Sequence, residues 1–231
     1  MQKGLSIQSK NRHSIAASIF WVGVIGLLLV SLYVGYRFYM YGERPPVPLP
    51  IAAARTDVSE QAITSAQREK HVVESTHPRY LSIPALSIEN ARILAMGVKE
   101  NGELDTPANI FDTCWYRESA TPGDGLSALL IDGHNGGPTK DGVFKQLPAL
   151  SHRDTISIER GDGEIFTYMV KEVKEVSLEE LNNGGMKDLS YSIEPSVQGL
   201  NLISCTGTWI PAKKTYDKRI IVRAVLQENA N

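Results

Sequence analysis

The sequence has 231 residues and a formal net charge of −2, which suits one ordinary domain plus an attachment segment; its near-average composition excludes disordered and collagen-like classes. The charge is uneven, because residues 1–40 hold four basic side chains and no carboxylate, which leaves 20 basic against 26 acidic side chains in the remainder. That acidic excess would repel phosphate backbones, so we expect no nucleic-acid partner.

The first predicted element is an apolar helix. Residues 15–36 form a 22-residue stretch without a charge, and at 1.5 Å per residue such a helix covers about 33 Å, enough for a bilayer core of about 30 Å. Two alternatives are a cleaved signal peptide and a buried core helix. Bulky residues follow the stretch where a signal peptide would have small ones, so we expect an uncleaved membrane anchor in the lipid bilayer.

The flanks of this helix predict its orientation. Lys3, Lys10 and Arg12 precede it and should stay on the cytoplasmic side, and Arg37 and Arg44 weaken this contrast without reversing it. We therefore expect a plasma-membrane protein with a single span, a cytoplasmic tail at 1–13, an anchor at 14–41, and everything later outside the cell.

A spacer is predicted next. Residues 43–50 contain four prolines, which exclude a helix interior and favour an extended chain. Residues 51–75 are polar and are expected as a helix or a flexible stalk, and the sequence leaves open whether they cover a functional site as a lid. Residues 42–75 thus form a predicted spacer and stalk between the anchor and a folded domain at 76–231.

The folded domain is predicted to be mainly β. Short β-type runs alternate with turn residues, and helical signal is limited to VFKQLPAL and SLEELNN. This pattern favours a closed or sandwich-like β domain over alternating β and α units. The runs are ARILAMGV, LSALLID, TISIE, EIFTYMVKEV, LNLIS and RIIVRAVL.

The two cysteines, Cys114 and Cys205, lie in no CxxC pair, which excludes a zinc site by spacing. A single disulfide between them is an alternative, although a disulfide scaffold of this length would need more cysteines. Cys205 follows the apolar run NLIS and is expected at a strand end, where a loop starts at Thr206. A thiol in such a place is accessible while the strand fixes its position.

A nucleophilic thiol needs a basic partner, because the thiolate is the reactive form. His134 is the best candidate, since it ends the run LLIDG and Gly133, Gly136 and Gly137 around it let backbone and substrate approach closely. Alternatively His134 is an ordinary loop histidine and Cys205 a small buried apolar residue. The other histidines have no comparable setting: His13, His71, His77 and His152.

The order of a histidine, then NLISC, then Arg219 fourteen residues later resembles the sortases, whose nucleophile follows a TLxT-like stretch. IPALSIENARILAMGV and the segment from TPANIF to His134 are similar to the same family, and the resemblance covers most of residues 80–227. Cys114 stands where many relatives outside the housekeeping sortases have glycine, and we interpret it as a small packed residue. The chain is therefore identified as a sortase-like cysteine transpeptidase of non-housekeeping type, with a closed β-barrel, short helices and one N-terminal transmembrane helix.

The resemblance assigns Cys205 as nucleophile, His134 as acid/base and Arg219 as the group that steadies the charged intermediate. Arg219 and Arg223 lie four residues apart and should share a face of the strand; the family pattern selects Arg219, and Arg223 is interpreted as an edge-strand charge. Substrate contacts are expected from the residues beside this trio: Gly133, Asn135, Ser204 and Thr206.

The resemblance also implies the reaction and its partners. Cys205 would cleave an LPxTG-like sorting signal between Thr and Gly through a thioester, and a peptidoglycan or pilin amine would accept the acyl group. No cofactor is required. Some relatives bind calcium, but Glu100, Glu103 and Asp105 are interpreted as a solvated acidic turn. The alternatives are a catalytically silent sortase-like binding ectodomain and a hydrolase; an L,D-transpeptidase would need a Ser-x-Gly-Cys stretch, which the sequence lacks.

Overall fold

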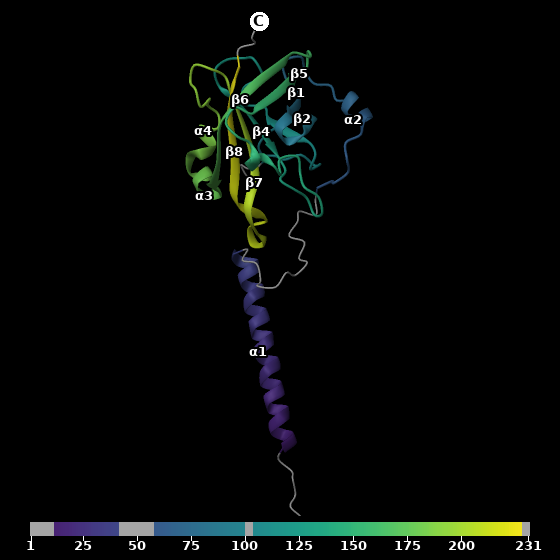
Figure 1. Ribbon diagram of the computed structural model, residues 1–231, viewed down its shortest axis with the longest axis vertical. Coiled ribbons are helices and arrows are strands. Elements are labelled where there is room, and N and C mark those ends of the chain that lie inside the picture. Colours follow the sequence, from purple (N-terminus) through teal and green to yellow (C-terminus); the bar gives the residue numbers. More distant parts are fainter. Residues whose placement is uncertain (1–11, 42–57, 100–103, 228–231) are drawn as a thin grey trace, which may run out of the picture. The chain divides into compact units, whose positions relative to one another are not determined.

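A computed structural model describes residues 12–41, 58–99 and 104–227 of the protein. The chain divides into two units, one containing the N-terminal helix α1 and the other containing the β domain (Figure 1).

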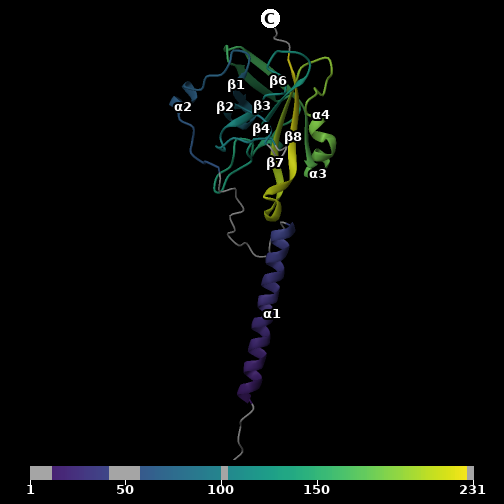
Figure 2. The same cartoon turned by 180° about the vertical axis from the view of Figure 1, so that it is seen from behind.

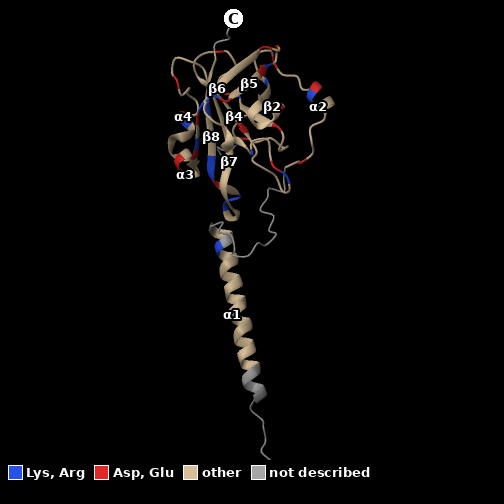
Figure 3. Cartoon of the chain, in the orientation of Figure 1, with Lys and Arg blue, Asp and Glu red and all other residues tan. Residues whose placement is uncertain are grey.

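Helix α1 runs from Arg12 to Tyr41, which agrees with the apolar helix expected from the sequence. Its segment Ala17–Arg37 is long and apolar enough to cross a membrane. Among the side chains of α1 that the structure describes, only Arg37 is charged (Figure 3). A helix that exposes apolar side chains such as Val22 and Leu27 on all sides is suited to a lipid environment.

The β domain is a closed eight-stranded barrel, as predicted (Figures 1 and 2). Around the barrel the strands follow the order β1-β2-β3-β4-β7-β8-β6-β5. The pair β4–β7 is parallel and the pair β6–β8 is antiparallel. The strands are β1 (Pro78–Ile83), β2 (Ile88–Met96), β3 (Thr113–Tyr116), β4 (Ala128–Gly133), β5 (Thr155–Arg160), β6 (Ile165–Ser177), β7 (Gly199–Ile210) and β8 (Thr215–Leu226).

Closure of the barrel corrects one expectation. Arg223 was interpreted as a charge on an edge strand, but β8 lies between β7 and β6 and has no open edge. The Arg223 guanidinium instead donates to the carbonyl of Tyr191 at 3.0 Å and to Oδ1 of Asn201 at 3.3 Å. Arg223 therefore joins β8 to β7 and to the segment before β7.

Alternation along the strands separates two apolar clusters. Leu129 and Ile131 of β4 point into the barrel and pack with Leu200 and Leu202 of β7. The residues between them face outward, where Leu130, Ile203 and other apolar residues form a second cluster. Its remaining buried members are Val176, Leu181, Leu189 and Ile221. The wall formed by β4, β7 and β8 is thus covered on both faces.

The helices are short, as the weak helical signal predicted. VFKQLPAL forms the turn η2 (Leu147–Ala149), and SLEELNN forms α3 (Leu178–Glu180) and η3 (Leu181–Gly185). The remaining short elements are α2 (Ser65–Glu69), η1 (Pro84–Leu86), α4 (Met186–Asp188) and η4 (Pro211–Lys213). Leu181 and Leu189, from the α3–α4 region, cover the outer cluster.

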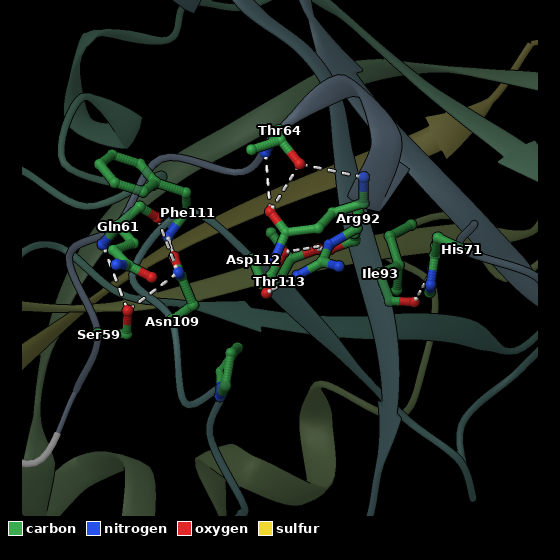
Figure 4. A network of polar contacts seen from close by, with 12 residues as sticks. Ser59, Gln61, Thr64, His71, Arg92, Ile93, Asn109, Phe111, Asp112 and Thr113 are labelled. Atoms are coloured by element: carbon green, nitrogen blue, oxygen red, sulfur yellow. Dashed lines mark hydrogen bonds and ion pairs between the residues drawn. The ribbon is translucent and has the colours of Figure 1, made fainter. Parts of the chain in front are cut away.

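The described part of the predicted stalk lies against the barrel. The Tyr80 hydroxyl donates to the carbonyl of Arg68. Figure 4 shows a second bond, between Nε2 of His71 and the carbonyl of Ile93 at 3.0 Å. The backbone N–H of Gly161 donates to the carbonyl of His77 at 2.9 Å. These bonds fix the path of the chain from about residue 68 into β1.

Candidate active site

His134 directly follows β4, whose last residue is Gly133. Its side chain is buried, with 8% exposed, and Nε2 lies 2.7 Å from the carbonyl oxygen of Pro107. A carbonyl oxygen only accepts, so Nε2 carries the hydrogen, and in the neutral ring Nδ1 is the nitrogen that accepts a proton. The Pro107 carbonyl therefore fixes both the orientation and the tautomer of the imidazole.

The parallel pairing of β4 with β7 brings Cys205 next to His134. Leu130 pairs with Asn201 and Asp132 with Ile203. Continuing this register by two residues sets His134 beside Cys205, with both side chains on the outer face. The Ser204 hydroxyl supports the continuation, since it donates to the Gly133 carbonyl at 2.7 Å.

The hairpin of β7 and β8 brings Arg219 opposite Cys205. Two contacts define the register: Asn201 meets Arg223, and Gly207 lies against Asp217, whose Oδ1 accepts the backbone N–H of Thr208 at 2.6 Å. Counting equal steps along the two antiparallel strands between these contacts predicts that Arg219 is the partner of Cys205. Residues opposite each other in an antiparallel pair project from the same face.

The three predicted catalytic residues thus share the outer face of the barrel wall, by continuation of the strand registers. Ile220 and Val222 belong to the barrel core, so Arg219 and Ile221 face outward, as His134 and Cys205 do. The outer cluster with Ile203 and Ile221 forms an apolar floor beside them. Three stretches of the chain that are distant in sequence thus converge on one face of three adjacent strands.

The position of Cys205 in β7 differs from the prediction. The sequence suggested that the strand ends at Cys205, but β7 continues to Ile210. The reason is that β4 stops at Gly133 while β8 continues to pair with β7. Cys205 lies where β7 loses its β4 neighbour but keeps β8, which leaves the thiol partly exposed on a strand that remains supported.

The Arg219 guanidinium is held by its own strand. One terminal nitrogen donates to the carbonyls of Tyr216 and Lys218, both at 2.9 Å, and the other donates to Oγ1 of Thr215 at 2.9 Å. A guanidinium has five N–H donors in a fixed fork. These bonds orient the group and leave part of its donor capacity for an oxygen of a bound molecule.

The second cysteine has a different environment. Cys114 of β3 is buried, with 4% exposed, and its thiol donates to the carbonyl of Asp105 at 3.3 Å. Burial, together with the nearby charge of Asp132, raises the pKa of the Cys114 thiol far above its usual range. Both cysteines are free, so the disulfide alternative is wrong, and Cys114 is the packed residue that the sequence predicted.

The four residues expected to contact a substrate differ in burial and in their hydrogen-bond partners. Ser204 is fully buried and links β4 to β7, so its side chain does not face a substrate. Gly133 is also buried, and a side chain there would collide with the ring of Phe144. Thr206 is partly exposed and lies 3.4 Å from a carboxylate oxygen of Glu175. Asn135 is partly exposed, and its carbonyl accepts the N–H of Gly142.

The glycines around His134 were expected to let backbone and substrate approach closely. The backbone does approach, since Gly136 lies against the carbonyl of Lys140, whereas the space beside Gly137 is filled by the carboxylate of Glu60. The groups of the protein itself take up this room. Neither Glu60 nor the Pro107 carbonyl was identified from the sequence.

A hollow lies on the same outer wall, over β2, β3 and β4. Its lining is part apolar and part acidic: Met96, Gly97, Leu104, Asp105, Cys114, Tyr116, Leu130 and Asp132. Asp105 lies 3.6 Å from the ammonium of Lys99, whereas Glu100 and Glu103 fall outside the described residues. Across residues 12–41, 58–99 and 104–227, no three His, Cys, Asp or Glu side chains are grouped to hold a metal ion.

Comparison with known proteins gives a family match. A family model described as the sortase domain matches residues 81–227. No curated protein sequence matches the chain.

Several solved structures are similar to this chain at low sequence identity. Sortase C1 of GBS pilus island 1 is 19% identical with a TM-score of 0.47, over 66% of this chain and 64% of that one. A Clostridium perfringens sortase D5 transpeptidase is 18% identical with a TM-score of 0.47, and the match covers 72% of this chain and 90% of that chain. A lid mutant of sortase A from Corynebacterium diphtheriae is 23% identical with a TM-score of 0.48, and the match covers 70% of this chain and 76% of that chain.

Proposed function

Since this chain belongs to the sortase family, we propose that it is a cysteine transpeptidase of the non-housekeeping type that cleaves an LPxTG-like sorting signal. The proposal is supported by the register of β4 and β7, whose continuation beyond the pair Asp132–Ile203 sets His134 beside Cys205, and by the contacts between β7 and β8, which favour Arg219 as the neighbour of Cys205 on the other side. A nucleophile, a proton carrier and a permanent cation on one face are the parts that acyl transfer requires.

In the first step the Cys205 thiol gives its proton to Nδ1 of His134, and the resulting thiolate attacks the carbonyl carbon of the substrate Thr. The resulting tetrahedral intermediate collapses, the bond from carbon to the Gly nitrogen breaks, and a thioester forms on Cys205. The departing amine takes a proton from the imidazole of His134. The Pro107 carbonyl holds Nε2, so the proton that moves is the one on Nδ1.

The negative oxygen of the intermediate needs a donor close by. Arg219 stands opposite Cys205, and its guanidinium stays charged at any physiological pH. Its bonds to Thr215, Tyr216 and Lys218 hold it in place before the substrate arrives, so little reorganisation is needed when charge develops.

In the second step an amine of a peptidoglycan precursor or a pilin attacks the thioester. His134 removes the proton from this amine, an amide bond forms, and the Cys205 thiolate leaves. This step requires that the amine reach the thioester before water does. Such a reaction attaches substrate proteins to the cell wall or to each other and uses no cofactor.

The apolar helix supports the proposed location. We propose that α1 anchors the chain in the plasma membrane with the N-terminus in the cytoplasm and the barrel outside, because Ala17–Arg37 has the length and apolarity of a membrane span. A sorting signal on a secreted protein would then meet the enzyme at the outer surface of the membrane.

A peptide assay tests the activity. The full chain in detergent is incubated with fluorogenic LPxTG-type peptides, with and without triglycine, beside a Cys205→Ala variant. We expect cleavage by the unmodified protein alone, and a product joined to triglycine. Equal turnover by the variant would remove Cys205 from the mechanism, and cleavage that never yields the triglycine product would favour the hydrolase.

A further inference from the structure

Residues 58–64, which we call the strap, precede α2 and cross the barrel beside the histidine. On one side the strap pairs with the loop that contains Pro107. The N–H of Ser59 donates to the Ala108 carbonyl at 2.7 Å, and the N–H of Ile110 donates to the Ser59 carbonyl at 3.0 Å. The Asn109 side chain adds a bond to the Gln61 carbonyl at 2.9 Å (Figure 4).

On its other side the strap holds the loop that follows His134. The Glu60 carboxylate accepts the backbone N–H groups of Thr139 and Lys140 at 2.6 and 2.9 Å, and the Thr139 hydroxyl at 2.5 Å. The Lys140 ammonium donates to the Glu60 carbonyl at 3.1 Å. Gly137 makes this approach possible, because a Cβ there would collide with the carboxylate.

Both loops bond to His134, the first to its imidazole and the second to its backbone carbonyl. The first carries the Pro107 carbonyl that bonds to Nε2 of His134. The second begins at the residue after His134 and returns to it, since the N–H of Phe144 donates to the His134 carbonyl at 2.9 Å. The strap is bonded to both loops, and Glu60 is the side chain that reaches the second one.

We propose that Glu60 is a positioning residue, which fastens the loop after His134 to the strap and so holds the imidazole in register with Cys205. This inference rests on the proposed function, because its effect on rate requires that His134 carry the proton. Glu60 acts through this loop, to which its carboxylate is bonded.

Because Glu60 lies at the surface, a positioning role can be distinguished from a merely structural one by comparing effects on rate and on stability. Its bonds lie at solvent-exposed atoms, so they add little to the stability of a barrel whose core is elsewhere. A small displacement of a catalytic group, in contrast, costs on the order of 10- to 100-fold in rate. Loss of the carboxylate should thus affect catalysis much more than folding.

The test compares the peptide-cleavage kinetics of the Glu60→Gln variant with those of the unmodified full-length chain. Glutamine keeps the size but removes the negative charge, so the bonds from the Thr139 and Lys140 N–H groups to Oε1 weaken, and it places an NH2 group where the Thr139 hydroxyl now donates. We expect kcat for an LPxTG-type peptide to fall about 10-fold with KM within about twofold, since substrate contacts are unchanged. Glu69→Gln, an exposed glutamate of α2, is the matched control and should keep the kcat of the unmodified chain.

A second measurement reads the imidazole directly. In 15N-histidine-labelled protein, the Nε2 proton of His134 should give a protected NMR signal, identified by its absence in His134→Gln. We expect Glu60→Gln to weaken or remove this signal, and Thr139→Ala to have a smaller effect, because both backbone donors remain. The unfolding temperature should change little in either variant.

Three outcomes would overturn the inference. One is that Glu60→Gln keeps both its kcat and its Nε2 signal, and another is that it loses kcat only together with global unfolding. The third is that Glu69→Gln has the same effect. If the unmodified chain cleaves no sorting peptide, the proposed function fails, while the Nε2 signal still shows whether Glu60 positions His134.

Discussion

Cys114 and Cys205 have the same chemistry and opposite environments. Cys114 is buried and its pKa is raised, so it stays a neutral thiol, whereas Cys205 is partly exposed in β7, beyond the point where the neighbouring strand β4 ends. We expect iodoacetamide to modify the folded Cys114→Ala protein at Cys205 and to leave the folded Cys205→Ala protein unmodified. Mass spectrometry of the intact chains measures this. Modification of Cys114 at a comparable rate would contradict the assigned environments.

Arg219 is expected to act through its forked shape. Arg219→Lys keeps the charge but loses the planar fork that bonds to Thr215 and Tyr216 while facing an oxyanion. We expect kcat to fall by about 100-fold, as when an oxyanion donor is removed. Arg153→Lys, an exposed arginine beside β5, is the control in the peptide assay, and a similar fall there would show that the loss is unspecific.

His71 gives the barrel a dependence on pH. Burial lowers the pKa of His71 from its ordinary 6.5, so the unfolded chain binds a proton at a higher pH than the folded chain does. The stability that neutral His71 provides is complete well above pH 6.5 and declines as pH falls through the lowered folded value. The unfolding temperature should drop less between about pH 7.5 and about pH 5.5 in His71→Gln than in the unmodified chain.

An exposed histidine gives the matched comparison for this pH effect. His152→Gln should keep the pH profile of the unmodified protein. If His71→Gln also kept that profile, the pH effect would have to be assigned to other groups.

The sequence predicted the trio because each member has a distinctive side chain beside an apolar run. It could not predict the Pro107 carbonyl, since every residue carries a backbone carbonyl and only the fold determines which one meets His134. Glu60 was missed for a related reason, as it lies about 80 residues from its partners in a segment that reads as polar stalk. Substrate contacts were misjudged at Ser204, because its side chain alternates into the barrel.

At the scale of elements, the unequal ends of β4 and β7 create the site. The Ser204 hydroxyl secures the last contact between them by donating to the Gly133 carbonyl. Ser204→Ala removes one buried hydrogen bond and should lower the free energy of unfolding by about 1 kcal/mol. Ser157→Ala on β5, which lacks a comparable buried bond, is the control in urea unfolding. An equal loss in both would contradict the link.

The strands were predictable where they form long apolar runs, and less so elsewhere. Six runs coincide with β2 and β4 to β8, although β7 and β8 extend beyond them at the hairpin. β1 begins with Pro78 and Arg79, and β3 has only four residues, so neither produced a run of its own. Closure of the barrel is a tertiary property, and it explains why Arg223 was mistaken for an edge charge.

At the scale of the whole molecule, the apolar helix and the partly exposed thiol together allow the membrane orientation of the chain to be tested. If α1 anchors the chain with the barrel outside, a membrane-impermeant thiol reagent should label Cys205 on intact cells, and Cys205→Ala should remove this label. The membrane fraction should contain a chain of full mass. A mature chain that lacks residues 1–41 would instead identify a cleaved signal peptide.

The proposed reaction passes through a thioester, so capture of that adduct tests the central claim most directly. The full chain is mixed with an LPxTG-type peptide without an acceptor amine, quenched in acid, and analysed by mass spectrometry before and after hydroxylamine. We predict an added mass equal to the acyl part of the peptide up to Thr, located on Cys205 and removed by hydroxylamine. Peptide cleavage without any adduct on Cys205, or an adduct that persists in Cys205→Ala, would contradict the account.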